Sequence, residues 1–128
     1  MSPDPFQYAV IRVVPCIERE EFINVGVIVF CRTRGYLGVR LGYDADRIRA
    51  IAPGAELGGV DEHLEAISRI AAGEPDAGPI AWLSQSERFG WLVSPSSTVV
   101  QTSAIHSGLS DDPERTLAHL FQRLVMPG

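Results

Sequence analysis

The chain has 128 residues, of which 45% are hydrophobic, and its 11 basic and 16 acidic side chains give a formal net charge of −5. This length suits one domain with a sizeable core, so we expect residues 1–128 to fold as a single domain. The acidic balance disfavours non-specific binding to nucleic acids or anionic lipids. The N-terminus lacks the basic start and apolar stretch of a signal peptide, and the apolar run at 22–31 is too short to span a bilayer. We therefore expect a cytoplasmic protein that does not contact a membrane.

Two segments rich in Val, Ile and aromatic residues, at 6–16 and 22–33, flank a short charged stretch. This pattern predicts two antiparallel strands joined by a turn. If the turn centres on Arg19, residues whose numbers sum to about 38 lie opposite each other and share a face of the hairpin. The pairs expected from this register include Val10 with Ile28, Arg12 with Gly26, and Val14 with Asn24.

The two faces of this predicted hairpin differ in chemistry. One is wholly apolar and is expected to pack on helices; it carries Ala9, Ile11, Val13, Val25, Val27, Val29 and Cys31. The other mixes apolar side chains with Arg12, Asn24 and Gly26. In this register Cys16 and Cys31 lie roughly 30 Å apart at about 3.3 Å per residue, so no disulfide is expected between them.

Turn, cap and periodicity signals predict the remaining elements. In chain order they are a third strand at 36–43, a short helix capped by Asp44 and ending at Ile51, helices at 60–72 and 85–92, a fourth strand at 98–102, a polar loop at 103–110, and a helix at 113–125. The pattern Ser84 to Glu87 has the form of a capping box, and Asp112 followed by Pro113 is a helix start. The sequence thus predicts an α+β fold: an antiparallel sheet of three to four strands that begins with an N-terminal hairpin or meander, with helices packed on one face.

A small-anion site is one interpretation of Arg12, Asn24 and Gly26. Arg and Asn supply hydrogen-bond donors for a carboxylate or phosphate, and glycine in a strand often marks the close approach of a ligand. The ordinary structural interpretation is that Arg12 pairs with Glu21 or another carboxylate. Gly26 would then make room for an overlying tryptophan. Structural ion pairs are a common origin of such patterns.

Arg88 and His106 are the other candidate ligand-binding residues, because they would complete the site if they converge on Arg12 and Asn24. His106 lies in the predicted polar loop and is the one candidate general base, but lone loop histidines are usually surface residues. No nucleophile with a recognisable context accompanies it. No Cys, His, Asp or Glu residues have metal-ligand spacing, and no nucleotide-binding loop is present, so no metal or cofactor is expected.

The charged turn consists of Glu18, Arg19, Glu20 and Glu21. Its ordinary role is to keep the protein soluble. An exposed hairpin tip is also a natural docking point, because loops on a rigid scaffold frequently carry binding residues. We therefore treat these four residues as a candidate partner-binding site.

Five short segments together resemble the DUF3037 family of uncharacterised bacterial proteins. They are YAVIRVVP at 8–15, EFINVGV at 21–27, RFGWLV at 88–93, STVVQ at 97–101 and HSG at 106–108. The resemblance implies no established activity. It does imply a candidate partner, because members of that family are often encoded beside HipA-like serine/threonine kinases in a context like that of toxin–antitoxin pairs.

The leading hypothesis from the sequence is a small accessory or regulatory protein that acts by binding another protein, such as a HipA-like kinase, and that is not an enzyme. The alternative hypothesis is an enzyme or sensor that binds a small anionic ligand through Arg12 and Asn24. The sequence predicts no nucleic-acid partner and leaves the oligomeric state open.

Overall fold

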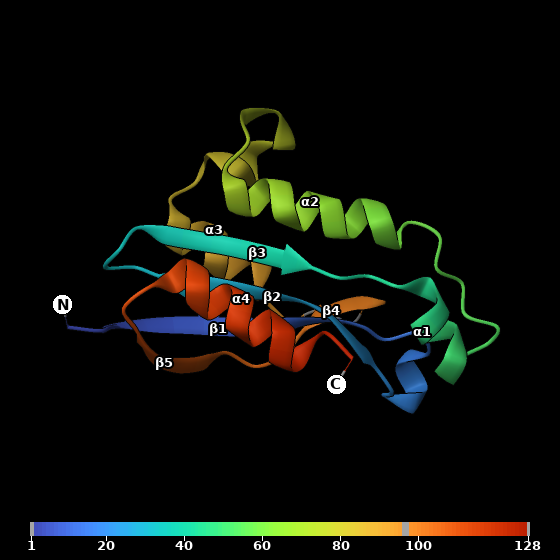
Figure 1. The fold of residues 1–128 in the computed structure, drawn as a ribbon. Coiled ribbons are helices and arrows are strands. Elements are labelled where there is room, and N and C mark those ends of the chain that lie inside the picture. Colours follow the sequence, from blue (N-terminus) through green and yellow to red (C-terminus); the bar gives the residue numbers. More distant parts are fainter. Residues whose placement is uncertain (1, 96–97, 128) are drawn as a thin grey trace.

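In the computed structural model, which describes residues 2–95 and 98–127, five strands form one antiparallel sheet and four α-helices lie on its two faces (Figure 1). The strands are β1 (Asp4–Val13), β2 (Ile23–Cys31), β3 (Tyr36–Leu41), β4 (Val100–Thr102) and β5 (His106–Ser110). The helices are α1 (Ala45–Ile51), α2 (Val60–Ala72), α3 (Gln85–Leu92) and α4 (Pro113–Leu124), and the 3-10 turns are η1 (Ile17–Arg19), η2 (Pro75–Ala77) and η3 (Pro79–Trp82). The predicted α+β fold with an N-terminal hairpin is confirmed.

The sheet order is β3-β2-β1, with β4 and β5 lying one after the other along the same side of β1. β4 pairs with the C-terminal end of β1 and β5 pairs with its N-terminal half. The segment predicted as a polar loop at 103–110 therefore contains a strand. The sequence of β5, HSGLS, has no β-branched or aromatic residue to signal a strand, so its conformation is set by the backbone pairing with β1.

The predicted register of the hairpin is wrong by one residue. β1 pairs Val10 with Val27 and Ile11 with Gly26, after which a bulge shifts the register so that Arg12 lies opposite Asn24. The bulge inserts Val25 as an extra residue on β2, and a one-residue shift turns side chains to the other face. The residues predicted to share one apolar face are therefore divided between both faces.

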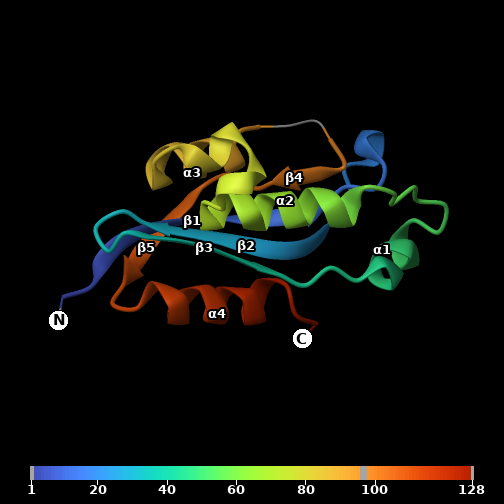
Figure 2. The same cartoon turned by 90° about the horizontal axis from the view of Figure 1, so that it is seen from above.

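Helices cover both faces of the sheet, whereas the prediction placed them on one (Figure 2). On one side α2, α3 and Ile48 of α1 pack on side chains such as Ile11, Ile28 and Phe30. On the other side α4 packs on β2 and β3, and its Leu117 joins a core with Val27, Val29 and Cys31. Both sides of the hairpin are apolar enough to be buried, so a helical layer on each face removes more apolar surface from water.

The helix boundaries follow their predicted caps. Ser84 and Glu87 form the reciprocal capping box at α3, and Asp112 accepts a hydrogen bond from the backbone N–H of Arg115 at α4. Both cysteines are free, as expected, and Cys31 is buried. Within 2–95 and 98–127, no helix combines the length and apolar character that a bilayer crossing requires.

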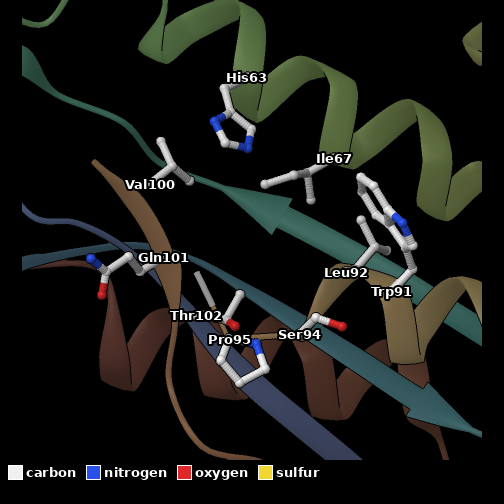
Figure 3. A pocket seen from close by; sticks show the side chains of 9 residues that line it. All are labelled: His63, Ile67, Trp91, Leu92, Ser94, Pro95, Val100, Gln101 and Thr102. Atoms are coloured by element: carbon white, nitrogen blue, oxygen red, sulfur yellow. The ribbon is translucent and has the colours of Figure 1, made fainter. Parts of the chain in front are cut away.

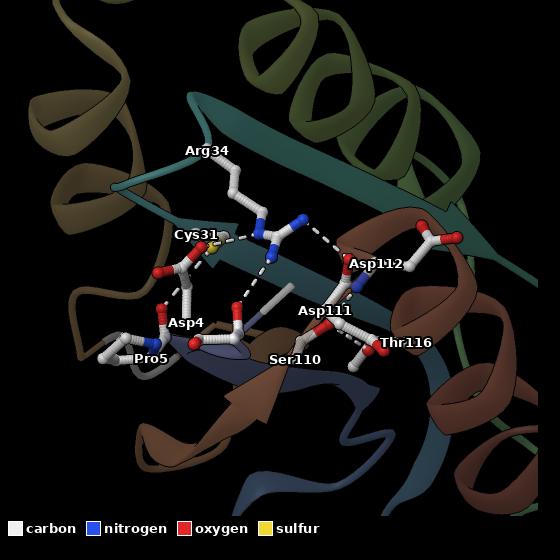
Figure 4. Close-up of polar contacts among 9 residues, drawn as sticks. Asp4, Pro5, Cys31, Arg34, Ser110, Asp111, Asp112 and Thr116 are labelled. Atoms are coloured by element: carbon white, nitrogen blue, oxygen red, sulfur yellow. Dashed lines mark hydrogen bonds and ion pairs between the residues drawn. The ribbon is translucent and has the colours of Figure 1, made fainter.

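A polar cluster around Arg34 joins three parts of the chain (Figure 4). The Arg34 guanidinium donates to the Asp4 carboxylate at 2.7 Å, to the backbone carbonyl of Asp111 at 2.6 Å and to that of Ser2 at 3.2 Å. Next to it, the hydroxyls of Ser110 and Thr116 lie 2.6 Å apart. The turn between β2 and β3 is thereby tied both to the start of β1 and to the junction between β5 and α4.

Candidate functional site

Arg12 lies near the end of β1, flanked by Asn24 on β2 and Gln101 on β4. Its guanidinium carbon is 4.1 Å from the centre of the Phe22 ring, a cation–π contact. The buried Nε atom has no hydrogen-bond partner, and no carboxylate forms an ion pair with Arg12 among the described residues. The expected pairing with Glu21 is not formed, because Glu21 pairs with Arg19 at 2.6 Å.

Asn24 is next to Arg12 but is already engaged in the fold. Its side-chain amide donates to the backbone carbonyl of Leu124, at the last residue of α4, over 3.0 Å. The Arg47 guanidinium donates to the backbone carbonyl of the next residue, Val125, at 2.9 Å. The carbonyls at a helix C-terminus have no partner inside the helix, so these two side chains satisfy them and anchor α4 to the sheet.

Gly26 faces the opposite side of the sheet from Arg12, because it pairs with Ile11 and Leu41. A Cβ atom at this position would lie 2.7 Å from Cδ2 of Leu41 and 2.9 Å from the backbone oxygen of Arg40. The glycine therefore makes room for a neighbouring side chain, as one interpretation proposed. That neighbour is Leu41 of the adjacent strand, and no tryptophan is involved.

Arg88 belongs to α3, on the face of the sheet away from Arg12. Its guanidinium donates to the carbonyl of Leu83 at 2.6 Å and to that of Ala71 at 3.4 Å, which joins the end of α2 to the start of α3. Its buried Nε has no partner within the part of the chain that the structure describes. The arginine thus cross-links two helices.

His106 is the first residue of β5 and is exposed. Its ring stacks on Tyr8, its partner across the β1–β5 pair, with ring centres 5.1 Å apart. Tyr8 is about 13 Å along β1 from Arg12, at about 3.3 Å per residue. Of the five candidate ligand-binding residues, the structure brings together only Arg12 and Asn24.

The predicted partner-binding turn forms an exposed tip on the hairpin. All four of its residues are exposed, and Glu20 adopts a left-handed backbone with φ of 58°. Two large apolar side chains flank the charges: Ile17 is 46% exposed and Phe22 is 43% exposed. We call residues 17–22 the hairpin-tip surface.

A hollow of about 510 Å³ separates the hairpin-tip surface from the loop that follows α1. Arg19 and Glu21 line one side of it, and the opposite side is formed by Ile51, Pro53 and Glu56 among others. Exposed apolar groups thus lie beside acidic ones at this end of the molecule. The sequence prediction named the charged residues, but it missed the apolar pair because Phe22 was assigned to a strand.

A second hollow, of about 340 Å³, lies between α2, the end of α3 and β4 (Figure 3). The exposed indole of Trp91 and the imidazole of His63 stand at its sides, and Ile67, Leu92 and Val100 form apolar walls. Among the described residues, its lining includes no carboxylate, cysteine or arginine. The other polar groups on its walls are the hydroxyls of Ser94 and Thr102 and the amide of Gln101. The walls come from three separate segments of the sequence, so no local motif marks this hollow.

Among the described residues, no three His, Cys, Asp or Glu side chains are grouped closely enough to hold a metal ion. The comparison with protein families matches residues 8–125 to the model described as "Protein of unknown function (DUF3037)". The chain belongs to the DUF3037 family. No curated protein and no solved structure matches it.

The span that matches the DUF3037 family runs from the middle of β1 to just beyond α4. It includes the whole hairpin-tip surface, Arg12, and every helix of the described chain. The family description assigns no activity, so the surfaces that this DUF3037 domain exposes are the main indication of its function. The hairpin-tip surface combines the charged residues that the sequence analysis singled out with the exposed side chains of Ile17 and Phe22.

Proposed function

We propose that this DUF3037 protein is a cytoplasmic accessory protein, not an enzyme, that acts by binding another protein through its hairpin-tip surface. The observation that carries the proposal is the exposure of Ile17 and Phe22 beside the acidic residues of the turn. Protein interfaces typically combine buried apolar or aromatic anchors with a polar rim. Ile17 and Phe22 are suited to be the anchors, and Glu18 and Glu20 to be the rim.

The hairpin-tip surface is held in place before any partner binds. Val13, Val14 and Val25, which form its base, are buried in the sheet. The Arg12 guanidinium contacts the face of the Phe22 ring, and the Arg19–Glu21 ion pair spans the turn. Preorganised side chains lose less conformational entropy on binding, which favours affinity.

The charge of the hairpin-tip surface indicates the chemistry of its partner. The turn carries three glutamates and one arginine, and the arginine is already paired with Glu21. The remaining negative charge would be met by a basic surface with an apolar recess for Phe22. A HipA-like serine/threonine kinase is the candidate that the family resemblance implies, and binding would then regulate the kinase.

Co-purification of the tagged protein with a HipA-like kinase tests this proposal. We expect capture of the kinase by the wild type and loss of capture by Ile17→Lys and Phe22→Ala. Trp91→Lys is the matched control, because Trp91 is comparably exposed, at 53%, but lies on α3, on the face of the sheet away from Arg12. Capture should also weaken with added salt, since rim charges are screened.

The proposal is wrong if the wild type captures no kinase and its addition leaves kinase activity unchanged. It is also wrong if capture survives both tip substitutions. Circular dichroism melting of each variant separates a lost contact from a lost fold. Ile17→Lys is the more informative variant, because Ile17 makes no cation–π contact of the kind that Phe22 makes with Arg12.

A second candidate function, the binding of a small anion, is favoured by one observation: Arg12 has no ion-pair partner among the described residues. Its weakness is that Asn24 is already hydrogen-bonded, while Arg88 and His106 lie elsewhere. A thermal-shift screen with phosphate, nucleotides and simple carboxylates discriminates the two functions. This candidate requires a rise in melting temperature that Arg12→Ala removes; a screen without any such rise rejects it.

A further inference from the structure

β5 forms an open border of the sheet. It pairs with β1 on one side, and no described strand pairs with its other side (Figure 1). Its five residues extend about 17 Å and present backbone N–H and C=O groups toward that open side. Such an edge is a template for another extended chain, and natural sheets usually protect it with charged residues, proline or a bulge.

The sequence leaves this edge without any such protection. No Asp, Glu, Lys or Arg occurs from position 89 to position 110, although 21% of the whole chain is charged. Neither proline nor a charged side chain lies within β5 itself. Two copies of a chain with net charge −5 repel each other over most of their surface, so an uncharged edge is where they can approach at least electrostatic cost.

The same edge carries an apolar projection and a recess that are two residues apart. Leu109 is 68% exposed, and its neighbour on the same face, Ser107, lines a hollow of about 440 Å³. The walls of this hollow include Pro5, Phe30 and Arg32. Because a two-fold interface brings the same patch together from both copies, a projection beside a recess on one strand is self-complementary.

We infer that two copies of this chain associate by antiparallel pairing of their β5 strands about a two-fold axis at Gly108. In that register Ser107 of each copy lies opposite Leu109 of the other copy. Each leucine then reaches the hollow of the other copy, and the two sheets join into one. Gly108 at the axis has no side chain to keep the strands apart, and its own face is covered by Phe6.

This dimer does not depend on the proposed function. β5 pairs with the N-terminal half of β1, whereas the hairpin-tip surface follows its C-terminal end. The two tips of the dimer therefore point in opposite directions, away from the shared edge. Association of two copies and capture of a kinase can be tested separately on the same preparations.

The first measurement is sedimentation equilibrium over a wide concentration range. The 13.9 kDa chain should show twice that mass, and Leu109→Lys should return it to a monomer while still capturing the kinase. Ile17→Lys should do the opposite, remaining dimeric but losing the kinase. A wild type that stays monomeric at all concentrations, or a dimer that Leu109→Lys leaves intact, overturns the inference.

The second measurement tests the register even if the lysine variant folds poorly. Directly opposed residues of an antiparallel pair have Cα atoms about 4.5–5.5 Å apart, a separation that a disulfide can span. Ser107→Cys and Leu109→Cys proteins are prepared separately in a Cys16→Ser background, because the native Cys16 is free and partly exposed. When mixed and oxidised with copper phenanthroline they should form disulfide-linked heterodimers, whereas each alone should not. Absence of cross-linking in the mixture overturns the proposed register.

Discussion

Replacement of Arg34 by alanine tests whether the cluster at the start of β1 holds the fold together. The guanidinium makes three hydrogen bonds, to Asp4, Asp111 and Ser2, and its side chain is only 22% exposed. Alanine would remove all three and leave the Asp4 carboxylate without its cation. Arg34 lies between two predicted strands and no local motif marks it, so its role as a clamp is visible only in the structure.

The expected cost can be estimated contact by contact. A hydrogen bond contributes about 0.5–1.5 kcal/mol, and a partly exposed ion pair contributes about 1 kcal/mol or less. Together the three contacts contribute about 3 kcal/mol, and release of the arginine from its fixed rotamer returns about 1 kcal/mol. The net loss is about 2 kcal/mol, which corresponds to a fall of about 6–10 °C in melting temperature for a domain of this size.

Thermal and urea unfolding, followed by circular dichroism, measure this loss. Arg34→Lys should lose part of the stability, since lysine keeps the charge but cannot form the guanidinium fork. Arg49→Ala is the control, because Arg49 is exposed and removal of its charge should change the stability by less than about 0.5 kcal/mol. If Arg34→Ala and Arg49→Ala unfold at the same urea concentration, the clamp does not stabilise the protein.

Three further substitutions test the packing at two glycines and the ionisation of Tyr36. In urea unfolding, Gly26→Ala should destabilise the protein by about 1–3 kcal/mol, because its Cβ would overlap Leu41 and a backbone oxygen. Gly90→Ala in α3 meets no atom within 4 Å and should stabilise the protein by about 0.5–1 kcal/mol. Equal effects of the two substitutions would contradict this packing. Burial, then the nearby Glu114 carboxylate, raises the pKa of Tyr36 above its ordinary value of 10.0. The folded state therefore binds this proton more tightly, and the resulting stability is lost as pH rises above about 10. Tyr36→Phe should make the fall in the urea midpoint above about pH 10 shallower; identical slopes would contradict the shift.

Local signals were sufficient to predict the helices. The capping box at Ser84 and the Asp112–Pro113 start are formed by neighbouring residues, so the sequence contains the whole interaction. The boundaries of α2 and α3 accordingly match the prediction, and α4 ends one residue earlier. Signals of this kind do not depend on how the rest of the chain packs.

The register of the hairpin could not be predicted in the same way. It depends on the conformation of the turn, where Glu20 adopts a left-handed backbone, and on the bulge at Val25. Val25 is one of several valines on β2, and nothing distinguishes it in the sequence as an inserted residue. Since one inserted residue reverses the faces, the predicted proximity of Arg12 and Gly26 did not survive, although Arg12 and Asn24 remained neighbours.

β1 connects the two surfaces proposed here to bind other molecules. Ala9, Ile11 and Val13 are fully buried, so the strand offers a rigid connection between the β5 edge and the base of the hairpin tip. Binding at one end then requires no rearrangement at the other, and each tip should have the same affinity in a monomer as in a dimer. Dimerisation would strengthen binding only through avidity, toward a partner that presents two sites. A monomeric kinase should consequently bind the wild type and Leu109→Lys equally well, whereas a partner with two spaced sites should bind the wild type more tightly.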